Sequence, residues 1–424
     1  MACTDTDGGE ERRDRSIELS ARVVRWLSRV TSGGRYIAEL DGLRFVAIAL
    51  VVLHHIGGFL AVRRASELSA AHDPIATTLV RHGYIGVQIF FAISGFILAL
   101  PFAERKMSAS PSPSLRAYFS RRITRLEPPY IINLLICFVA LVAMGKYTVP
   151  YLVKHLLASV FYLHGLLYGE GSVLNPVTWS LEIEVQFYAM APLLCTVFAI
   201  HDKIMRRAAL ALVVAVGYAV RYALHAWLHF PAAFDNAGHG QLLLDYLAYF
   251  AAGMLAVDFY LNEWREAEPS SGAWDLIGLG SAVALFRVLA LSGRFGNLSM
   301  LIAPFLVLLL LCAAFRGPLL SRVLRDRAIA TTGGMCYTIY LYHFLVVSVV
   351  ETRSVHVLVS RAYWPNFLLQ CAIVGPAVLL VSSAAFVAFE KPFMHKDWPA
   401  RLWALNSWMR GKEKTVEQSS AGAN

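Results

Sequence analysis

Residues 44–62 read RFVAIALVVLHHIGGFLAV, an apolar run that starts at an arginine and contains two adjacent histidines. A helix of about 20 such residues crosses the roughly 30 Å hydrocarbon core of a bilayer. The segment 150–168 is interrupted by Lys154, His155 and His164, so we expect it to be interfacial or re-entrant. Ten membrane-spanning helices are therefore predicted. They are expected near residues 44–62, 83–102, 129–145, 186–201, 208–228, 241–260, 274–292, 298–315, 335–352 and 367–389.

The composition of the chain agrees with a membrane protein. Of its 424 residues, 57% are hydrophobic and only 16% are charged, whereas soluble domains usually carry about 25% charged residues. A soluble enzyme, a disordered chain and a small disulfide scaffold are thereby excluded. The six cysteines are scattered and are interpreted as small core residues, so no metal site is expected. We predict an all-α integral membrane protein.

The basic residues indicate the orientation of this protein. Loops that face the cytoplasm of a membrane protein usually carry an excess of lysine and arginine. If the N-terminus is cytoplasmic, the inner segments hold 28 of the 38 Lys and Arg residues and the outer loops hold 8. Both termini are therefore expected in the cytoplasm. The net charge of +9 then reflects orientation, and no nucleic-acid partner is expected.

Three regions follow from this pattern. Residues 1–35 form a cytoplasmic N-terminal tail, residues 36–392 the transmembrane domain, and residues 393–424 a cytoplasmic C-terminal tail. Within the first tail, Val23, Leu27 and Val30 recur at helical spacing among arginines. This pattern fits either a short basic amphipathic helix on the inner leaflet or a frayed tail.

The first predicted span contains two ionisable groups that need a reason to be there. Arg44 and His55 are eleven residues apart, roughly 16 Å of helical rise and close to three turns, so both project from one face. Charged side chains within a span cost about 2.5–3.5 kcal/mol on insertion scales. We therefore favour a functional role for the pair over membrane anchoring by Arg44 and interhelical bonding by His55.

A second basic group precedes the third predicted span. Arg121, Arg122 and Arg125 lie just before the Pro128–Pro129 pair. The planar guanidinium group suits bidentate binding of phosphate. Clusters of this kind also occur at the inner ends of many spans, so both interpretations stay open from these residues alone.

Further candidate residues lie on other predicted spans. Ser94 stands in a small-residue stretch and, taken alone, is better explained by helix packing. Trp179 is a routine interfacial anchor, whereas Glu182 and Glu184 at the outer edge of the hydrocarbon are not. His343 ends a group of tyrosines that either lines a cavity or belongs to an aromatic belt.

Taken together in order and spacing, these segments resemble the acyltransferase-3 family of membrane-bound acyltransferases. The resemblance extends from about Ala38 to Pro392, and the combination of motifs is specific although each one is weak. The motifs are LDGLR (40–44) with His55, FFAISGFI (90–97), RRITR (121–125), WSLEIEVQFY (179–188), YLYH (340–343) and EKP (390–392).

The resemblance implies an acyltransferase of the bacterial cytoplasmic (inner) membrane. Its donor substrate would be acyl-CoA, in particular acetyl-CoA, with no permanently bound cofactor. Its acceptor would be a hydroxyl of a saccharide, a glycolipid or a similar molecule at the outer face, and membrane lipids would surround it. The phosphates of CoA would then meet Arg44, Arg122 and Arg125. His55 would be the general base, and Glu184 would orient the acceptor from outside.

The sequence departs from the family pattern in two places. His54 doubles the histidine, and Glu127 stands where the family is usually apolar before the proline. Some members carry an extracytoplasmic hydrolase-like domain, and we expect none in this protein. We therefore expect the membrane domain or a separate protein to complete the transfer.

Other mechanisms and functions compete with direct transfer. A covalent route through Ser94 or His55 is possible, but Ser94 would need a base from another helix. A transporter or exporter of a lipid-linked or small molecule would use Arg221, Arg287 and His55 as a translocation path. A structural or sensory scaffold would leave the Trp179–Glu184 segment unexplained.

The predicted orientation can be tested by cysteine labelling. With native cysteines replaced, Ser112→Cys should react only after the inner membrane is permeabilised, because the loop is expected inside. Gly171→Cys should react with an impermeant reagent added outside. The reverse pattern would invert the topology and remove the arginine cluster from cytoplasmic CoA.

Overall fold

The computed structural model describes residues 26–30, 36–64, 68, 80–107, 114–227, 242–265, 271–291, 298–395 and 398. Within these ranges the chain consists of helices and connections, without strands. Eight helices are long and apolar enough to cross a membrane, and ten are if each of two bent helix pairs counts as one span. The prediction of an all-α membrane protein with about ten spans is confirmed.

The helices follow the predicted spans closely. They are α2 (Ala38–Arg63), α4 (Ile85–Met107), α5 (Leu115–Ala143), α6 (Val149–Val160), α7 (His164–Tyr168), α8 (Trp179–Leu194), α9 (Lys203–Trp227), α11 (Leu243–Phe259), α12 (Gly272–Ala290), α14 (Ser299–Arg316), α15 (Pro318–Leu324), α16 (Arg327–Gly334), α17 (Cys336–Ser354) and α18 (Tyr363–Ala385). The segment 150–168 forms the short helices α6 and α7, shorter than a span.

Two helices begin well before the predicted spans. α5 starts at Leu115, so the arginine cluster and both prolines lie inside it. Its first turn is capped by Ser114, whose Oγ accepts from the Ala117 amide at 3.5 Å, and the helix continues past Pro128 and Pro129. α8 likewise starts at Trp179. Arg122, Arg125 and Glu184 are therefore held on helices rather than in loops.

Two short helices that the hydropathy pattern does not show lie between α14 and α17. α15 is bent by 87° from α14, and α16 by 74° from α17. Both pack against the start of α2. A Cβ atom on Gly333 would lie 1.7 Å from the Asp41 carbonyl oxygen, and one on Gly42 would lie 2.3 Å from that of Leu324. Only glycine permits this contact, which fixes the α2 end that carries Arg44.

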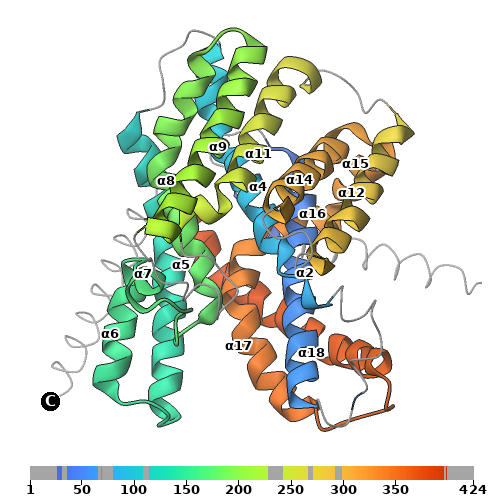
Figure 1. Ribbon diagram of the computed structural model, residues 1–424. Coiled ribbons are helices and arrows are strands. Elements are labelled where there is room, and N and C mark those ends of the chain that lie inside the picture. The colour runs from blue at the N-terminus through green and yellow to red at the C-terminus, as the bar shows by residue number, and fades with distance from the viewer. Residues whose placement is uncertain are drawn as a thin grey trace, which may run out of the picture.

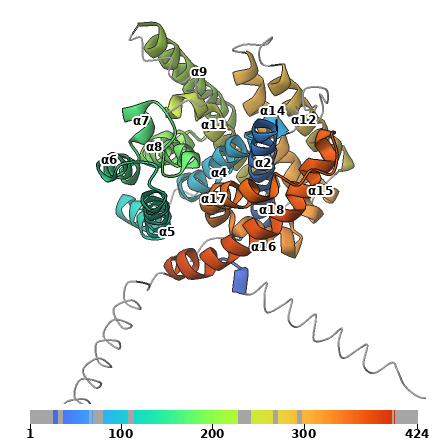
Figure 2. The same ribbon diagram turned by 90° about the horizontal axis from the view of Figure 1, so that it is seen from below.

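α4 and α17 lie in the middle of the helix arrangement. Figure 2 shows them between a group formed by α5, α6, α7 and α8 and a group formed by α2, α12, α14, α15 and α18. In Figure 1, α11 crosses close to α4 in the upper part of the molecule. α4 thus contacts α2, α8 and α11 together, and side chains from several helices meet around it.

Glycines allow α4 and α11 to touch backbone to backbone. A Cβ atom on Gly253 would lie 1.9 Å from the Ala92 carbonyl oxygen, and one on Gly95 would lie 2.1 Å from that of Phe250. Close approach of this kind is how helices gain packing in a membrane, where the hydrophobic effect does not drive them together.

Ion pairs join α9 to α11 and account for five of the charged residues in these helices. Arg206 pairs with Asp258, and Arg221 pairs with Asp245. Arg207 binds the other Asp258 oxygen at 2.7 Å. A buried charge is tolerated when a partner neutralises it, so these residues explain how α9 is held.

Part of the predicted tails is described. Leu27 and Val30 pack against the transmembrane domain, and Met394 is buried. Among the five described cysteines none is in a disulfide. Ser112 and the remainder of the proposed amphipathic helix lie outside the described residues.

The α4–α11 contact predicts a large effect of a single methyl group. Gly253→Ala should destabilise the fold by about 1–3 kcal/mol because the added carbon must push the two backbones apart. Gly280→Ala on α12 is the matched control, since a Cβ atom there meets nothing within 4 Å. Unfolding in mixed micelles by SDS titration measures both, and equal stability of the two variants would contradict the packing described here.

Candidate active site

A cavity of about 670 Å³ lies between α2, α4, α5, α8 and α17; we name it the arginine cavity. Six arginines and three glutamates are among the described residues that line it. The excess of positive charge marks it as a site for an anion. Its charged lining residues are Arg29, Arg44, Arg105, Arg121, Arg122, Arg125, Glu104, Glu184 and Glu390.

The predicted arginines converge on this cavity from different helices. Arg44 on α2 donates to Asp41 at 2.8 Å. Arg122 on α5 donates to its own helix at the Tyr118 carbonyl at 3.0 Å, and its guanidinium carbon lies 3.7 Å from the centre of the Tyr118 ring. Within the described chain, the Nε atoms of Arg122 and Arg125 are buried without a hydrogen-bond partner. Buried donors of this kind are costly unless a ligand satisfies them.

Ser94 and Glu184 also meet in the arginine cavity. The Ser94 hydroxyl donates to Glu184 Oε1 at 2.6 Å, which joins α4 to α8. Ser94 has no neighbour in the sequence that could act as a base, and the structure places the Glu184 carboxylate of another helix beside it. α8 starts at Trp179, so Glu184 lies about a turn and a half inside the helix and lines the arginine cavity. Its role in orienting an acceptor from outside stays a prediction. Its neighbour Glu182 instead accepts from the Gly165 amide at 2.8 Å and holds α7.

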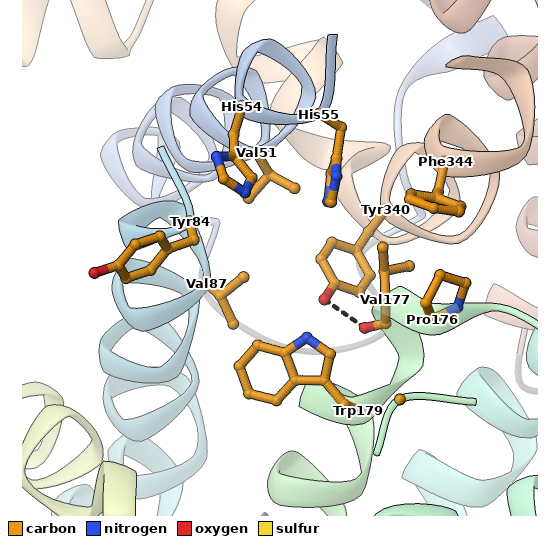
Figure 3. A pocket seen from close by; sticks show the side chains of 11 residues that line it. Val51, His54, His55, Tyr84, Val87, Pro176, Val177, Trp179, Tyr340 and Phe344 are labelled. Atoms are coloured by element: carbon orange, nitrogen blue, oxygen red, sulfur yellow. Dashed lines mark hydrogen bonds between the residues drawn. The ribbon is translucent and has the colours of Figure 1, made fainter. Parts of the chain in front are cut away.

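His55 lies in a second cavity of about 230 Å³, which we name the histidine cavity. Figure 3 shows His54 and His55 from α2 above the opening, with Trp179 and Tyr340 facing them. Its lining is otherwise mainly apolar and aromatic, as is typical of pockets for organic ligands. Gly171 also lines it, so labelling of Gly171→Cys reports on access to this cavity.

The structure distinguishes the two adjacent histidines. His54 Nδ1 donates to the Val80 carbonyl at 2.7 Å, which ties α2 to the start of the next span. The His55 ring lies 5.1 Å from that of His343 and 5.2 Å from that of Phe344. His54 therefore has a structural hydrogen bond that fixes its ring, whereas His55 is packed among the rings of α17.

His343 lies behind His55 and is not among the lining residues of either cavity. It is fully buried, and its Nδ1 donates to the Tyr340 carbonyl at 2.7 Å. This bond fixes the tautomer, so Nε2 is left as an acceptor. His343 therefore supports the His55 ring from within the bundle.

Buried amides hold the segment that brings Trp179 to the histidine cavity. Asn175 donates to Asn133 Oδ1 and to the Leu341 carbonyl, both at 2.9 Å. Asn133 donates to the same carbonyl at 3.1 Å. These hydrogen bonds between buried groups fix the segment before α8 to α5 and α17.

The two cavities share Val87 and Tyr340 as lining residues. The Tyr340 hydroxyl donates to the Val177 carbonyl at 2.7 Å, drawn in Figure 3, and lies 2.6 Å from Ser180 Oγ. Tyr340 is therefore held firmly between the arginine cavity on one side and His55 on the other. Arg44 and His55, three turns apart on α2, line one cavity each.

The model of the acyltransferase-3 family, described as an acyltransferase domain, matches residues 37–386. The chain belongs to this family. The match begins before Arg44 and ends after Tyr340, so it contains the histidine cavity and most of the residues that line the arginine cavity. The resemblance inferred from the six motifs is confirmed.

Named relatives agree with this family membership. The chain is 23% identical over 403 residues to the peptidoglycan O-acetyltransferase OatA of Listeria monocytogenes, with 89% of this chain and 58% of the relative covered. It is 25% identical over 325 residues to the acyltransferase MdmB of Streptomyces mycarofaciens, with 73% and 78% covered. The chain thus spans little more than half of the length of the Listeria protein. No solved structure matches the chain.

The family motifs converge at the two cavities. Arg44, Arg121, Arg122, Arg125, Ser94 and Glu184 line the arginine cavity, and His55 and Trp179 line the histidine cavity. Glu390 belongs to the EKP motif, for which the sequence gives no role. In the structure it lines the arginine cavity and accepts a hydrogen bond from the Thr338 hydroxyl. A carboxylate at the end of the last apolar run was the feature of the sequence that could have indicated Glu390 as a site residue.

The residues of the transporter interpretation do not converge. Arg221 is paired with Asp245, and Arg287 is on an exposed face of α12. Neither lines the arginine cavity or the histidine cavity. Their placement gives no support to a translocation path through His55. Within the described residues, no group of three or more His, Cys, Asp or Glu side chains is arranged to hold a metal ion.

The contrast between the histidines predicts opposite effects of two substitutions. His54→Ala should lower stability by about 1 kcal/mol through loss of the Val80 bond and retain most acyl transfer. His55→Ala should accumulate normally and lose transfer by about 10²–10⁴-fold, the usual contribution of a general base. Micelle unfolding and transfer assays measure both, and an inactive His54→Ala beside an active His55→Ala would reverse the assignment.

Proposed function

We propose that this protein is a membrane O-acyltransferase that moves an acyl group, in particular acetyl, from acyl-CoA to a hydroxyl group. The acceptor is a saccharide, a glycolipid or a similar molecule at the outer face of the bacterial cytoplasmic membrane. One observation carries the proposal: an arginine-lined cavity and a cavity that contains His55 meet at Val87 and Tyr340. A polyanionic donor and a neutral acceptor thereby have adjacent but chemically different sites.

The arginine cavity suits the CoA moiety of the donor. Its arginines face the phosphates, because guanidinium groups bind phosphate through paired charge-assisted hydrogen bonds. The unsatisfied Nε–H groups of Arg122 and Arg125 gain acceptors when phosphate binds. The acyl-pantetheine arm then points toward Tyr340 and His55, since the arginines lie at the other end of the cavity's lining helices. By the charge distribution of the loops, this cavity opens to the cytoplasm.

Transfer in this arrangement is direct. His55 accepts the proton of the acceptor hydroxyl while its oxygen attacks the thioester carbonyl. The tetrahedral intermediate collapses with cleavage of the carbon–sulfur bond, and the proton on His55 passes to the thiolate of CoA. The products are an ester and CoA, so no oxidant, metal ion or further reactant is required.

The Ser94–Glu184 pair supports the donor site in this mechanism. Both side chains line the arginine cavity, whereas His55 lines the other, so their hydrogen bond orders the wall along which the donor lies. A covalent route through Ser94 would use Glu184 as its base. Under direct transfer, Ser94→Ala keeps measurable activity and no acylated protein is found by mass spectrometry.

The donor site can be tested with purified protein and acetyl-CoA. Consumption of the thioester is expected with an acceptor present, and a transporter would show none. Arg122→Ala and Arg125→Ala should raise the KM for acetyl-CoA by roughly 10–100-fold, because a charge-assisted hydrogen bond contributes about 1.5–3 kcal/mol. The KM for the acceptor should change little.

Arg116→Ala is the matched control, since Arg116 lies on α5 as well but is exposed and outside both cavities. Its kinetics should equal those of the wild-type protein. If Arg122→Ala and Arg125→Ala raised the KM of donor and acceptor equally, the arginines would act on folding, and the donor site proposed here would be wrong.

A further inference from the structure

Three residues that line the arginine cavity lie outside the matched family domain, Arg29 and Val30 before it and Glu390 after it. Arg29 lines the cavity, whereas the family match begins at residue 37. It belongs to the described segment 26–30, which precedes the first span. No motif of the family therefore accounts for this guanidinium group.

The segment that carries Arg29 is hydrogen-bonded to the C-terminal end of the transmembrane domain. Lys391 Nζ donates to the Trp26 carbonyl at 2.5 Å, and the Val30 amide donates to Met394 Sδ at 3.4 Å. Figure 2 shows these two ends of the described chain, blue and red, beside one another. Leu27 and Val30 also pack against the core. The segment is thus held at the cavity by contacts on both sides of Arg29.

Arg29 and Arg44 share a single carboxylate. Arg29 Nε lies 2.9 Å from Asp41 Oδ2, and Arg44 donates to Asp41 Oδ1 at 2.8 Å. Asp41 is fully buried, and the Arg29 side chain is 16% exposed. The single negative charge of Asp41 lies between the two guanidinium groups of Arg29 and Arg44. These three groups together therefore carry a net positive charge at the cavity wall. An anion bound in the cavity would help to balance this charge.

The pKa of Arg29 agrees with this shortage of negative charge. Burial and repulsion from Arg44 and Arg125, partly offset by Asp41, lower the pKa of Arg29 to about 10. The guanidinium group is therefore still charged at neutral pH, in an environment with more positive than negative neighbours. An anion in the cavity would relieve this repulsion.

We propose that Arg29 is a further donor-binding residue, which the segment 26–30 delivers to the arginine cavity to bind a phosphate of CoA together with Arg44. The inference rests on the proposed function, because it takes acyl-CoA as the ligand of this cavity. The N-terminal segment then completes the donor site from outside the family domain. Arg29 binds the donor and takes no part in the transfer step.

The full-length protein in detergent allows a direct test with free CoA as the probe. Arg29→Gln should raise the Kd for CoA at least tenfold, the loss expected for one charge-assisted contact to phosphate. Transfer from acetyl-pantetheine, which has no phosphate, should be unchanged. The Kd of Arg29→Lys for CoA should lie between those of the wild-type protein and Arg29→Gln, because lysine keeps the charge without the planar guanidinium group.

Arg325→Gln is a matched control. Arg325 pairs with Glu39 at 2.6 Å in the same first turn of α2 but does not line the arginine cavity. Its Kd for CoA should stay within twofold of the wild-type value. Thermal unfolding midpoints of all three variants show whether a loss of binding follows from a loss of structure.

The outcomes separate the inference from the proposed function. If the wild-type protein binds no CoA and consumes no thioester, the proposed function fails. If the wild-type protein binds CoA and Arg29→Gln binds it equally well, the function stands and the role of Arg29 is refuted. Equal losses with CoA and with acetyl-pantetheine would make Arg29 a structural tether and also overturn the inference. Where Arg29→Gln does not fold, Arg29→Lys decides: unchanged CoA affinity contradicts the proposal.

Discussion

The cost of placing charge inside an apolar helix bundle governs the arrangement of this protein. An unpaired ionised group within a bilayer is expensive, so each one must have a partner or face a polar cavity. Arg206 and Arg221 follow the first rule through Asp258 and Asp245. Arg122 and Arg125 follow the second, since they face a cavity and retain unsatisfied buried donors. The same physical cost thus separates the charges that hold helices together from those that line a cavity with unsatisfied donors.

Close helix packing turns these separate charges into a site. Gly253 lets α11 lie against α4, and Gly333 lets α16 lie against the first turn of α2. These contacts bring Ser94 to Glu184 and hold Asp41 where it binds Arg44. In a membrane such contacts depend on shape, because lipid tails are as apolar as the side chains they replace. The geometry of the site is therefore a consequence of glycine packing on the far sides of the same helices.

The division into two cavities gives the proposed reaction its direction. Tyr340 stands between the arginine cavity and the histidine cavity and is fixed by its bond to the Val177 carbonyl. In the proposed reaction, the phosphate-binding arginines lie on one side and the general base on the other. A donor bound by its charged end would then reach His55 only with its acyl end. Positioning of this kind contributes to rate without a covalent intermediate.

The sequence by itself determined the class of fold and most members of the site. Apolar runs of span length record directly which segments can cross a bilayer, and the spacing of Arg44 and His55 placed both on one face of α2. Only the tertiary structure decided which groups meet. Hydropathy marks the apolar part of α8 and not its start at Trp179, so it does not show that Glu184 lies within this helix and lines the arginine cavity. The partner of Ser94 and the approach of Arg29 to Asp41 join residues from separate segments, and packing between helices, which hydropathy does not encode, brings them together.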